Sequence, residues 1–294
     1  MVKSGRRSGS YRVFASCNTL FMVLLCVVFL YPFLFVIARS LSDGFYILRG
    51  QIYLFPRGFT LNAYEVMLGD PRMIRALLFT TQLTIVGTLV NLVLTVLAAY
   101  PLSRRSLKGA SIILAGIFIS WYFYPGLIPT FLLVKDVGLL DTMWSLILPD
   151  AIAPFLLIIL MTYIRGIPEE LEEAAVVEGC SYWRILTRIV VPISKPVLAT
   201  LTIFYAVGHW NQYFQALIYI SDPDKYTLQL RLQIILDLWS SRLQIVQTAQ
   251  EYGSLVAEGA QAAAIVIATV PIVLIYPFLQ RYFIKGVTLG AIKG

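Results

Sequence analysis

Uncharged runs separated by short charged segments make up most of this chain. There are six such runs: 13–38, 76–103, 109–134, 151–164, 196–221 and 259–280. A helix needs about 20 apolar residues to cross roughly 30 Å of hydrocarbon, and five of the runs are long enough as they stand. The fourth reaches this length if it begins near Met143. The pattern predicts an all-α integral membrane protein with six transmembrane helices, at about 17–38, 77–101, 110–134, 143–164, 196–220 and 260–280.

The first run resembles a signal peptide in one respect, because basic residues precede it. Its 26 uncharged residues exceed the apolar segment of a secretory signal, and no convincing small-x-small cleavage site closes it. We therefore interpret the run as a first transmembrane helix that is retained.

Lys and Arg are unevenly divided between the two sides that six spans create. With a cytoplasmic N-terminus, the inner segments hold 14 Lys and Arg in 66 residues, whereas the outer segments hold 9 in 90. Cytoplasmic loops carry the excess of these residues, so both termini are predicted to be cytoplasmic. The predicted layout is an N-terminal tail at 1–16, a transmembrane domain at 17–283 with an inner loop at 165–195 and an outer loop at 222–258, and a C-terminal tail at 284–294.

Composition restricts the chemistry open to the chain. Of its 294 residues, 59% are apolar and 13% are charged, which argues against a water-soluble enzyme. The three scattered cysteines (Cys17, Cys26 and Cys180) and the single histidine predict neither a disulfide framework nor a metal site. The net charge of +7 follows from the membrane orientation, so no nucleic-acid partner is expected.

No charged residue lies deep in a predicted span, although Asp150 falls near the end of one. Ion-coupled pumps need buried ionisable groups for the coupling. A chain with these spans that moves a solute uphill must therefore receive its energy from outside the bilayer. This points to a cytoplasmic loop on which another protein acts.

Several uncharged polar and aromatic residues fall inside the predicted spans. Asn91 shares a helix face with four threonines, and the fifth span carries a polar group in its outer half. Two interpretations stay open for both groups: lining of a solute path, or hydrogen bonding between packed helices. In the third span, Pro125 and Pro129 predict a kink or break beside aromatic residues whose faces suit a sugar. The candidate path residues are Asn91, Trp121, Tyr124, His209, Trp210, Asn211, Gln212 and Gln215.

The predicted inner loop, 165–195, has the pattern of a short helix held by a partner. Its first part is acidic and its second part basic, which suits the helix dipole. Small apolar residues, the glycine Gly179 and the aromatic pair Tyr182 and Trp183 lie between them. Such a segment fits a groove on another protein. Pro192 and Pro196 stiffen its exit toward the fifth span.

The predicted outer loop, 222–258, carries an apolar stripe typical of an amphipathic element.

The inner loop resembles the EAA loop of ABC importer permeases. The motif residues are Glu173, Ala174, Ala175, Gly179, Ile189 and Pro192, with Val191 where the family usually has Leu. Trp210-Asn211 with Phe214, Tyr226-Thr227-Leu228, and the ending from Gln280 to Gly294 are similar to carbohydrate-importer permeases of the maltose-type G subunit. The resemblance covers essentially the whole chain. Within this group it extends to permeases for complex oligosaccharides, including alginate.

This resemblance implies a MetI-like helical core in a bacterial inner membrane. The chain would form a heterodimer with a second, homologous permease above two cytoplasmic ABC ATPases, and a solute-binding protein would deliver the sugar. ATP-Mg would bind in the ATPases, so this chain would need no cofactor and would not itself be an enzyme. The motif residues and Thr288 and Lys293 of the C-terminal tail would contact the ATPases. The outer loop would meet the binding protein.

Other classes remain as alternatives. A secondary transporter is expected to have more spans and buried charges. An enzyme acting on glycans or lipids needs a carboxylate pair or a histidine cluster, for which Asp222 and Asp224 are weak candidates. A scaffold subunit that transports nothing is compatible with the composition alone.

Overall fold

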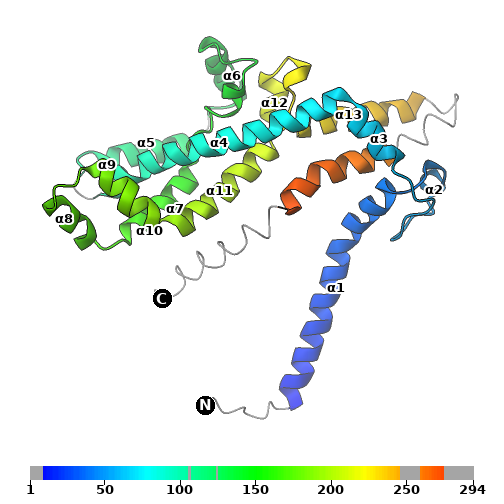
Figure 1. Ribbon diagram of the computed structural model, residues 1–294, viewed down its shortest axis with the longest axis horizontal. Helices are drawn as coiled ribbons and strands as arrows, with labels where there is room; N and C mark the ends of the chain where they lie inside the picture. The colour runs from blue at the N-terminus through cyan, green and yellow to red at the C-terminus, as the bar shows by residue number, and fades with distance from the viewer. Residues whose placement is uncertain (1–8, 105–106, 124, 246–258, 275–294) are drawn as a thin grey trace. The chain divides into compact units, whose positions relative to one another are not determined.

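The computed structural model describes residues 9–104, 107–123, 125–245 and 259–274, and every regular element among them is a helix (Figure 1). The all-α prediction is thus confirmed. The chain divides into two compact units: one contains the chain up to Asp70 and residues 235–267, and the other contains residues 71–234 and the chain from Ala268.

The first unit begins with a long apolar helix, α1 (Gly9–Ser40). Two short helices follow, α2 (Gly44–Leu48) and α3 (Asn62–Gly69). The hydroxyl groups of Ser40 and Tyr64 lie 2.7 Å apart and tie α3 to the end of α1. A small core of buried apolar side chains, Ala38, Ile47 and Ile52, joins α1 to α2 and the loop after it.

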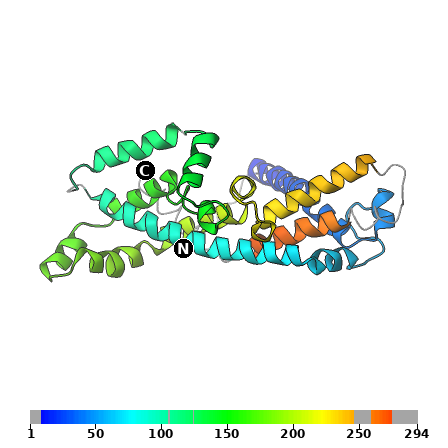
Figure 2. The same cartoon turned by 90° about the horizontal axis from the view of Figure 1, so that it is seen from above.

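The second unit is built along α4 (Pro71–Ser103), a helix of 33 residues. Two apolar helices pack on it, α7 (Pro154–Arg165) and α11 (Lys195–Trp210). Their shared core holds fully buried aliphatic side chains, among them Leu157, Leu160, Ile185 and Leu201. The short helices of the inner loop lie at the end of α4 where that helix terminates (Figures 1 and 2).

The third predicted span is broken, as its prolines predict. It consists of α5 (Ala110–Tyr122) and α6 (Leu127–Asp136), whose axes turn by more than 40°. Gly126 precedes α6 with φ of 93°, a conformation that glycine adopts at no steric cost. Tyr124 lies outside the described residues.

The fourth and fifth predicted spans differ from single long helices. In the fourth, a 3₁₀ turn, η1 (Met143–Leu146), is followed by non-helical chain, and α7 begins only at Pro154. In the fifth, α11 ends at Trp210 and a separate helix, α12 (Phe214–Tyr219), follows. The polar residues of the fifth span therefore lie at and beyond a helix end, where backbone groups are free to bond to side chains.

Within the part of the chain that the structure describes, two helices are individually long and apolar enough to cross a membrane, Val13–Ser40 and Pro71–Ser103. Two bent pairs, α5 with α6 and 182–193 with α11, bring the number to four if each pair is one span. α7 and the helix Gly259–Leu274 are shorter apolar helices. Helices thus occur at all six predicted places, and the number of membrane crossings stays a prediction.

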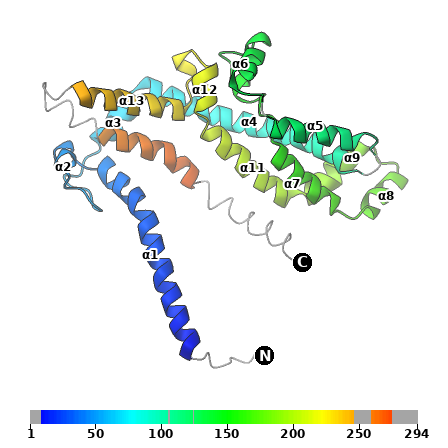
Figure 3. The same ribbon diagram turned by 180° about the vertical axis from the view of Figure 1, so that it is seen from behind.

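The predicted amphipathic element in the outer loop is a helix, α13 (Leu228–Ile245), preceded by a 3₁₀ turn, η3 (Pro223–Lys225). The beginning of its apolar stripe packs inside the chain, since Leu228 and Leu230 are fully buried. α6 and α12 lie on the same side of α4 (Figure 3), where the rings of Phe131 and Tyr219 stack with centroids 6.3 Å apart.

Candidate functional site

The inner loop folds into consecutive short helices separated by a glycine turn. α8 (Glu170–Val177) has three glutamates in its first turn, where the helix dipole favours negative charge. Gly179 ends it with φ of 79°, which L-residues rarely adopt. Ser181 then caps α9 (Tyr182–Ile185) by accepting a hydrogen bond from the Arg184 amide. A π-helical turn, η2 (Leu186–Val190), and α10 (Val191–Ile193) lead into α11.

The outer face of this segment is apolar and unusually open. Val177 is 89% exposed, Tyr182 72% and Trp183 65%. The exposure of this aromatic pair is as predicted. Exposed large apolar side chains on neighbouring short helices are typical of surfaces that contact a partner. Of the six motif residues, Glu173, Ala174, Gly179 and Pro192 are exposed, whereas Ala175 is buried and Ile189 half-buried.

The buried face of α8 carries an ion pair that holds it to the end of α4. The Glu172 carboxylate pairs with the guanidinium group of Arg104, and both side chains are largely buried. The Tyr100 hydroxyl donates to Glu172 Oε2 over 3.5 Å, and the Arg104 guanidinium lies over the Tyr100 ring, 4.9 Å from its centroid. Arg165 donates to the carbonyls of Leu102 and Ser103, the last residues of α4.

The sequence analysis does not predict this anchor, because it explains all the acidic residues at the start of the inner loop by the helix dipole. The signal that was available is helical spacing. Glu172 lies three residues before Ala175, and both are the buried residues of α8. A carboxylate on a buried helix face needs a positive partner, and Arg104 is the first charged residue after α4.

Most candidate path residues on α4 and α11 hydrogen-bond to one another. Asn91 Nδ2 is hydrogen-bonded to His209 Nε2 at 3.2 Å, and His209 Nδ1 to Gln212 Oε1 at 3.4 Å. Gln212 Nε2 donates to the Leu146 carbonyl, and Trp210 Nε1 to the Ala268 carbonyl. All four side chains are buried. This geometry corresponds to the helix-packing interpretation within the single chain.

Close approach of two helices accompanies this hydrogen bonding. At Gly87 of α4, an added Cβ would lie 2.5 Å from His209 Nε2, so the imidazole packs directly on the α4 backbone. Two turns further along α4, and one turn before His209 on α11, the hydroxyls of Thr95 and Tyr205 lie 2.7 Å apart. Small residues and hydroxyl bonds of this kind are typical of helix contacts in membranes.

The other candidate path residues are more open. Asn211 is exposed, donates to the Val207 carbonyl, and accepts a bond from Gln229. Gln215 is half-buried, and Trp121 of α5 is 45% exposed. Tyr124, Thr288 and Lys293 lie outside the described residues.

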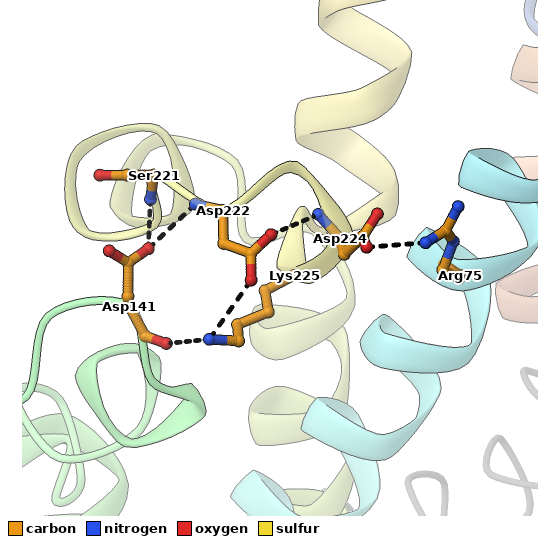
Figure 4. Close-up of polar contacts among 6 residues, drawn as sticks. All are labelled: Arg75, Asp141, Ser221, Asp222, Asp224 and Lys225. Atoms are coloured by element: carbon orange, nitrogen blue, oxygen red, sulfur yellow. Dashed lines mark hydrogen bonds and ion pairs between the residues drawn. The ribbon is translucent and has the colours of Figure 1, made fainter.

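A polar network fastens the turn after α6 to the turn after α12 (Figure 4). Asp141 Oδ1 accepts the amide hydrogens of Ser221 and Asp222 at 2.6 and 3.0 Å, and these bonds hold the pKa of the Asp141 carboxyl below its usual value. Lys225 Nζ donates to the Asp141 carbonyl, and Asp224 pairs with Arg75 of α4. The Asp222 carboxylate accepts the Asp224 amide hydrogen and lies 3.4 Å from Lys225 Nζ. Both carboxylates that were weak candidates for an enzymatic site are therefore bound within this network.

Comparisons with known proteins agree with this architecture. A family model described as a binding-protein-dependent transport system inner membrane component matches residues 6–289. The chain is 43% identical over 286 residues to Protein LplC of Bacillus subtilis, covering 96% of each. It is 39% identical over 275 residues to the polygalacturonan/rhamnogalacturonan transport system permease protein YtcP of the same organism, covering 93% of this chain and 96% of the relative.

A crystal structure of a bacterial ABC transporter involved in the import of the acidic polysaccharide alginate has a matching fold. The TM-score is 0.86 at 28% identity, over 95% of this chain and 100% of the matched chain. The helical core is the expected MetI-like permease fold. The chain therefore belongs to the binding-protein-dependent transport system inner membrane components, the permeases of ABC importers, in which a partner subunit hydrolyses ATP.

Proposed function

We propose that this chain is one of two permease subunits of an importer for acidic oligosaccharides, and that α8 is the element on which the ATPase acts. The observation that carries the proposal is the open apolar face of the α8–α9 segment, at the spacing of the EAA motif. Glu173 supplies an exposed negative charge beside that face. A basic residue on the ATPase is its expected partner, and ATP-Mg binds there.

The substrate class is inferred from the relatives. YtcP is described as transporting polygalacturonan and rhamnogalacturonan, and the matched structure takes part in the import of alginate. Polygalacturonan, rhamnogalacturonan and alginate are all acidic polysaccharides. We propose that Asn211 and Gln215 belong to the solute path, because Asn211 is exposed and Gln215 half-buried, whereas Asn91, His209 and Gln212 are buried.

The proposed topology has six crossings with both termini in the cytoplasm. α5 with α6 and the 143–164 segment each form one crossing, and α11 with α12 forms another. The segment 165–195 then faces the ATPases together with Thr288 and Lys293. The outer loop 222–258 faces a solute-binding protein. A second, homologous permease completes the path.

Substrate class is tested in proteoliposomes containing this chain, its partner permease, the ATPases and the binding protein. We expect short oligogalacturonate or oligomannuronate chains, but not maltotriose, to stimulate ATP hydrolysis. Asn211→Leu and Gln215→Leu should shift the dose curve, because each removes an amide that can bond to a sugar hydroxyl. Stimulation by neutral sugars alone would contradict the substrate class. Unchanged dose curves would return both amides to a packing role.

Glu173→Lys tests the coupling role. We expect uptake to fall by at least about tenfold while the chain still inserts, since like charges across an interface cost several kcal/mol and 1.4 kcal/mol is a factor of ten. The measurement is substrate uptake together with ATPase activity in the same vesicles. Glu170→Lys is the matched control, an exposed glutamate on the same helix outside the motif, and should retain uptake. Normal uptake by Glu173→Lys would remove α8 from the coupling role.

A further inference from the structure

The loop between α2 and α3 exposes a group of large apolar side chains. Within residues 53–61, termed here the aromatic loop, Tyr53 is 66% exposed, Phe55 78% and Phe59 68%. Leu54 and Leu61 are also exposed. Neither the transport path nor the coupling segment uses these residues. An exposed apolar group of this size indicates contact with something other than water.

The second half of the aromatic loop is fastened to residues 41–43, which directly follow α1. The amide of Asp43 donates to the carbonyls of Arg57 and Gly58 at 3.1 and 3.0 Å, and the amide of Thr60 donates to the Leu41 carbonyl at 3.1 Å. Ser42 Oγ accepts the Arg57 amide hydrogen at 3.1 Å. Because of these bonds, the loop stays at the level where α1 ends.

Gly58 shows how closely the loop approaches the segment after α1. Its φ is 61°, and an added Cβ would lie 2.9 Å from both the Asp43 Cβ and the Tyr46 ring. Ile52, just before the aromatic loop, is buried against Ala38 and Ile47. The loop is thus a packed structure whose apolar tip faces outward.

α1 fixes where the bilayer lies relative to this loop. Its candidate span runs from Val13 to Ser40, and its side surface is open, with Phe33 59% and Ile37 43% exposed. Its uncharged run ends at residue 38, and Arg39 follows. The first charge at the end of a span marks the transition from hydrocarbon to headgroups. In Figure 1, the loop after α2 turns back along α1, toward the N-terminal end of that helix.

We propose that the aromatic loop is an interfacial anchor that inserts Tyr53, Phe55 and Phe59 into the boundary between lipid headgroups and acyl chains. Aromatic side chains favour this boundary. Two observations favour lipid as the surface that the loop contacts. The loop continues the open apolar surface of α1, and the flanking charge is mainly positive (Arg39, Arg49 and Arg57 against Asp43), which complements lipid phosphate. The anchor holds the end of α1, and the α2–α3 segment bonded to it, at one depth.

The depth of the loop is measurable by spin labelling of the full complex in nanodiscs that contain phosphatidylglycerol. The free cysteines Cys17, Cys26 and Cys180 are replaced by Ser, and Phe55→Cys or Phe59→Cys carries the label. Collisions with oxygen, which partitions into lipid, are compared with collisions with a water-soluble nickel chelate. Glu65→Cys, at an exposed polar position on α3, is the matched control for water.

We expect the labels at 55 and 59 to favour oxygen over nickel relative to the label at 65. Equal, water-like access at all three sites would overturn the proposal. Shelter from both reagents at 55 and 59 would also overturn it, because the loop would then be covered by a protein subunit. The two positions are labelled separately, so a local structural change caused by replacing one ring would not by itself determine the result. The result is independent of substrate and ATPase, so it stands apart from the proposed transport function.

Discussion

Glu172→Arg is expected to abolish uptake, and the double variant Glu172→Arg with Arg104→Glu to restore a large part of it. The single change places two positive charges in a largely buried site, where the side chains of Arg104 and Glu172 are only 20% and 12% exposed. Removing one partner of a buried ion pair costs about 3–5 kcal/mol. That is enough to release α8 from the end of α4. The double variant recreates an attractive pair, and the Tyr100 hydroxyl can still donate to the relocated carboxylate.

The measurement is uptake by the complex, with recovery of the chain from membranes as a check on insertion. Rescue within the same chain separates this anchor from Glu173, whose expected partner is on another subunit. A double variant no better than Glu172→Arg alone would show that the pair does not position α8. Wild-type uptake by Glu172→Arg would do the same.

In the proposed coupling role, the anchor would add a route by which motion of α8 reaches the membrane. Pro192 and α10 connect the segment covalently to α11, as the sequence analysis anticipated. The ion pair and the Arg165 bonds connect it also to α4, whose other end pairs Arg75 with Asp224. A rigid helix with contacts at both ends can carry a displacement between them.

Gly87→Ala is expected to disrupt the contact between α4 and α11. The new methyl group would overlap the His209 ring, whose nearest carbons would be only 2.8 Å from it. Forcing extra volume into a packed core costs about 1–3 kcal/mol, and displacing the ring also breaks its bond to Asn91. We expect a lower midpoint of thermal unfolding for the purified complex and reduced uptake.

Gly208→Ala is the matched control, because nothing lies within 4 Å of the Cβ that it adds. It should be neutral or slightly stabilising, since Ala is favoured over Gly inside a helix. The double variant Gly87→Ala with His209→Ala should recover part of the lost stability by making room for the methyl group. Equal unfolding midpoints for Gly87→Ala and the unchanged chain would contradict the close approach.

The third and fifth predicted spans are both broken, but local sequence rules predict only the first of these two breaks. Pro125, Gly126 and Pro129 are sufficient to predict that the third span bends, because proline removes a backbone donor and glycine accepts positive φ. The end of α11 at Trp210 has no comparable marker. Here the amides of the fifth span bond to side chains and carbonyls of other segments, as Gln212 does to the Leu146 carbonyl.

The uncharged runs of the sequence are sufficient to predict a helical membrane protein, and the motif spacing is sufficient to locate its EAA segment. Uncharged runs, helix-breaking residues and motif spacing are properties of neighbouring residues, and they act wherever the chain folds. The packing of distant segments determines that Glu172 is buried against Arg104 while Glu173 stays exposed, and that Asn91 and His209 bond to each other. The physical reason is that the partner of a buried polar group is set by which distant segments pack together, and helix periodicity alone does not specify that choice.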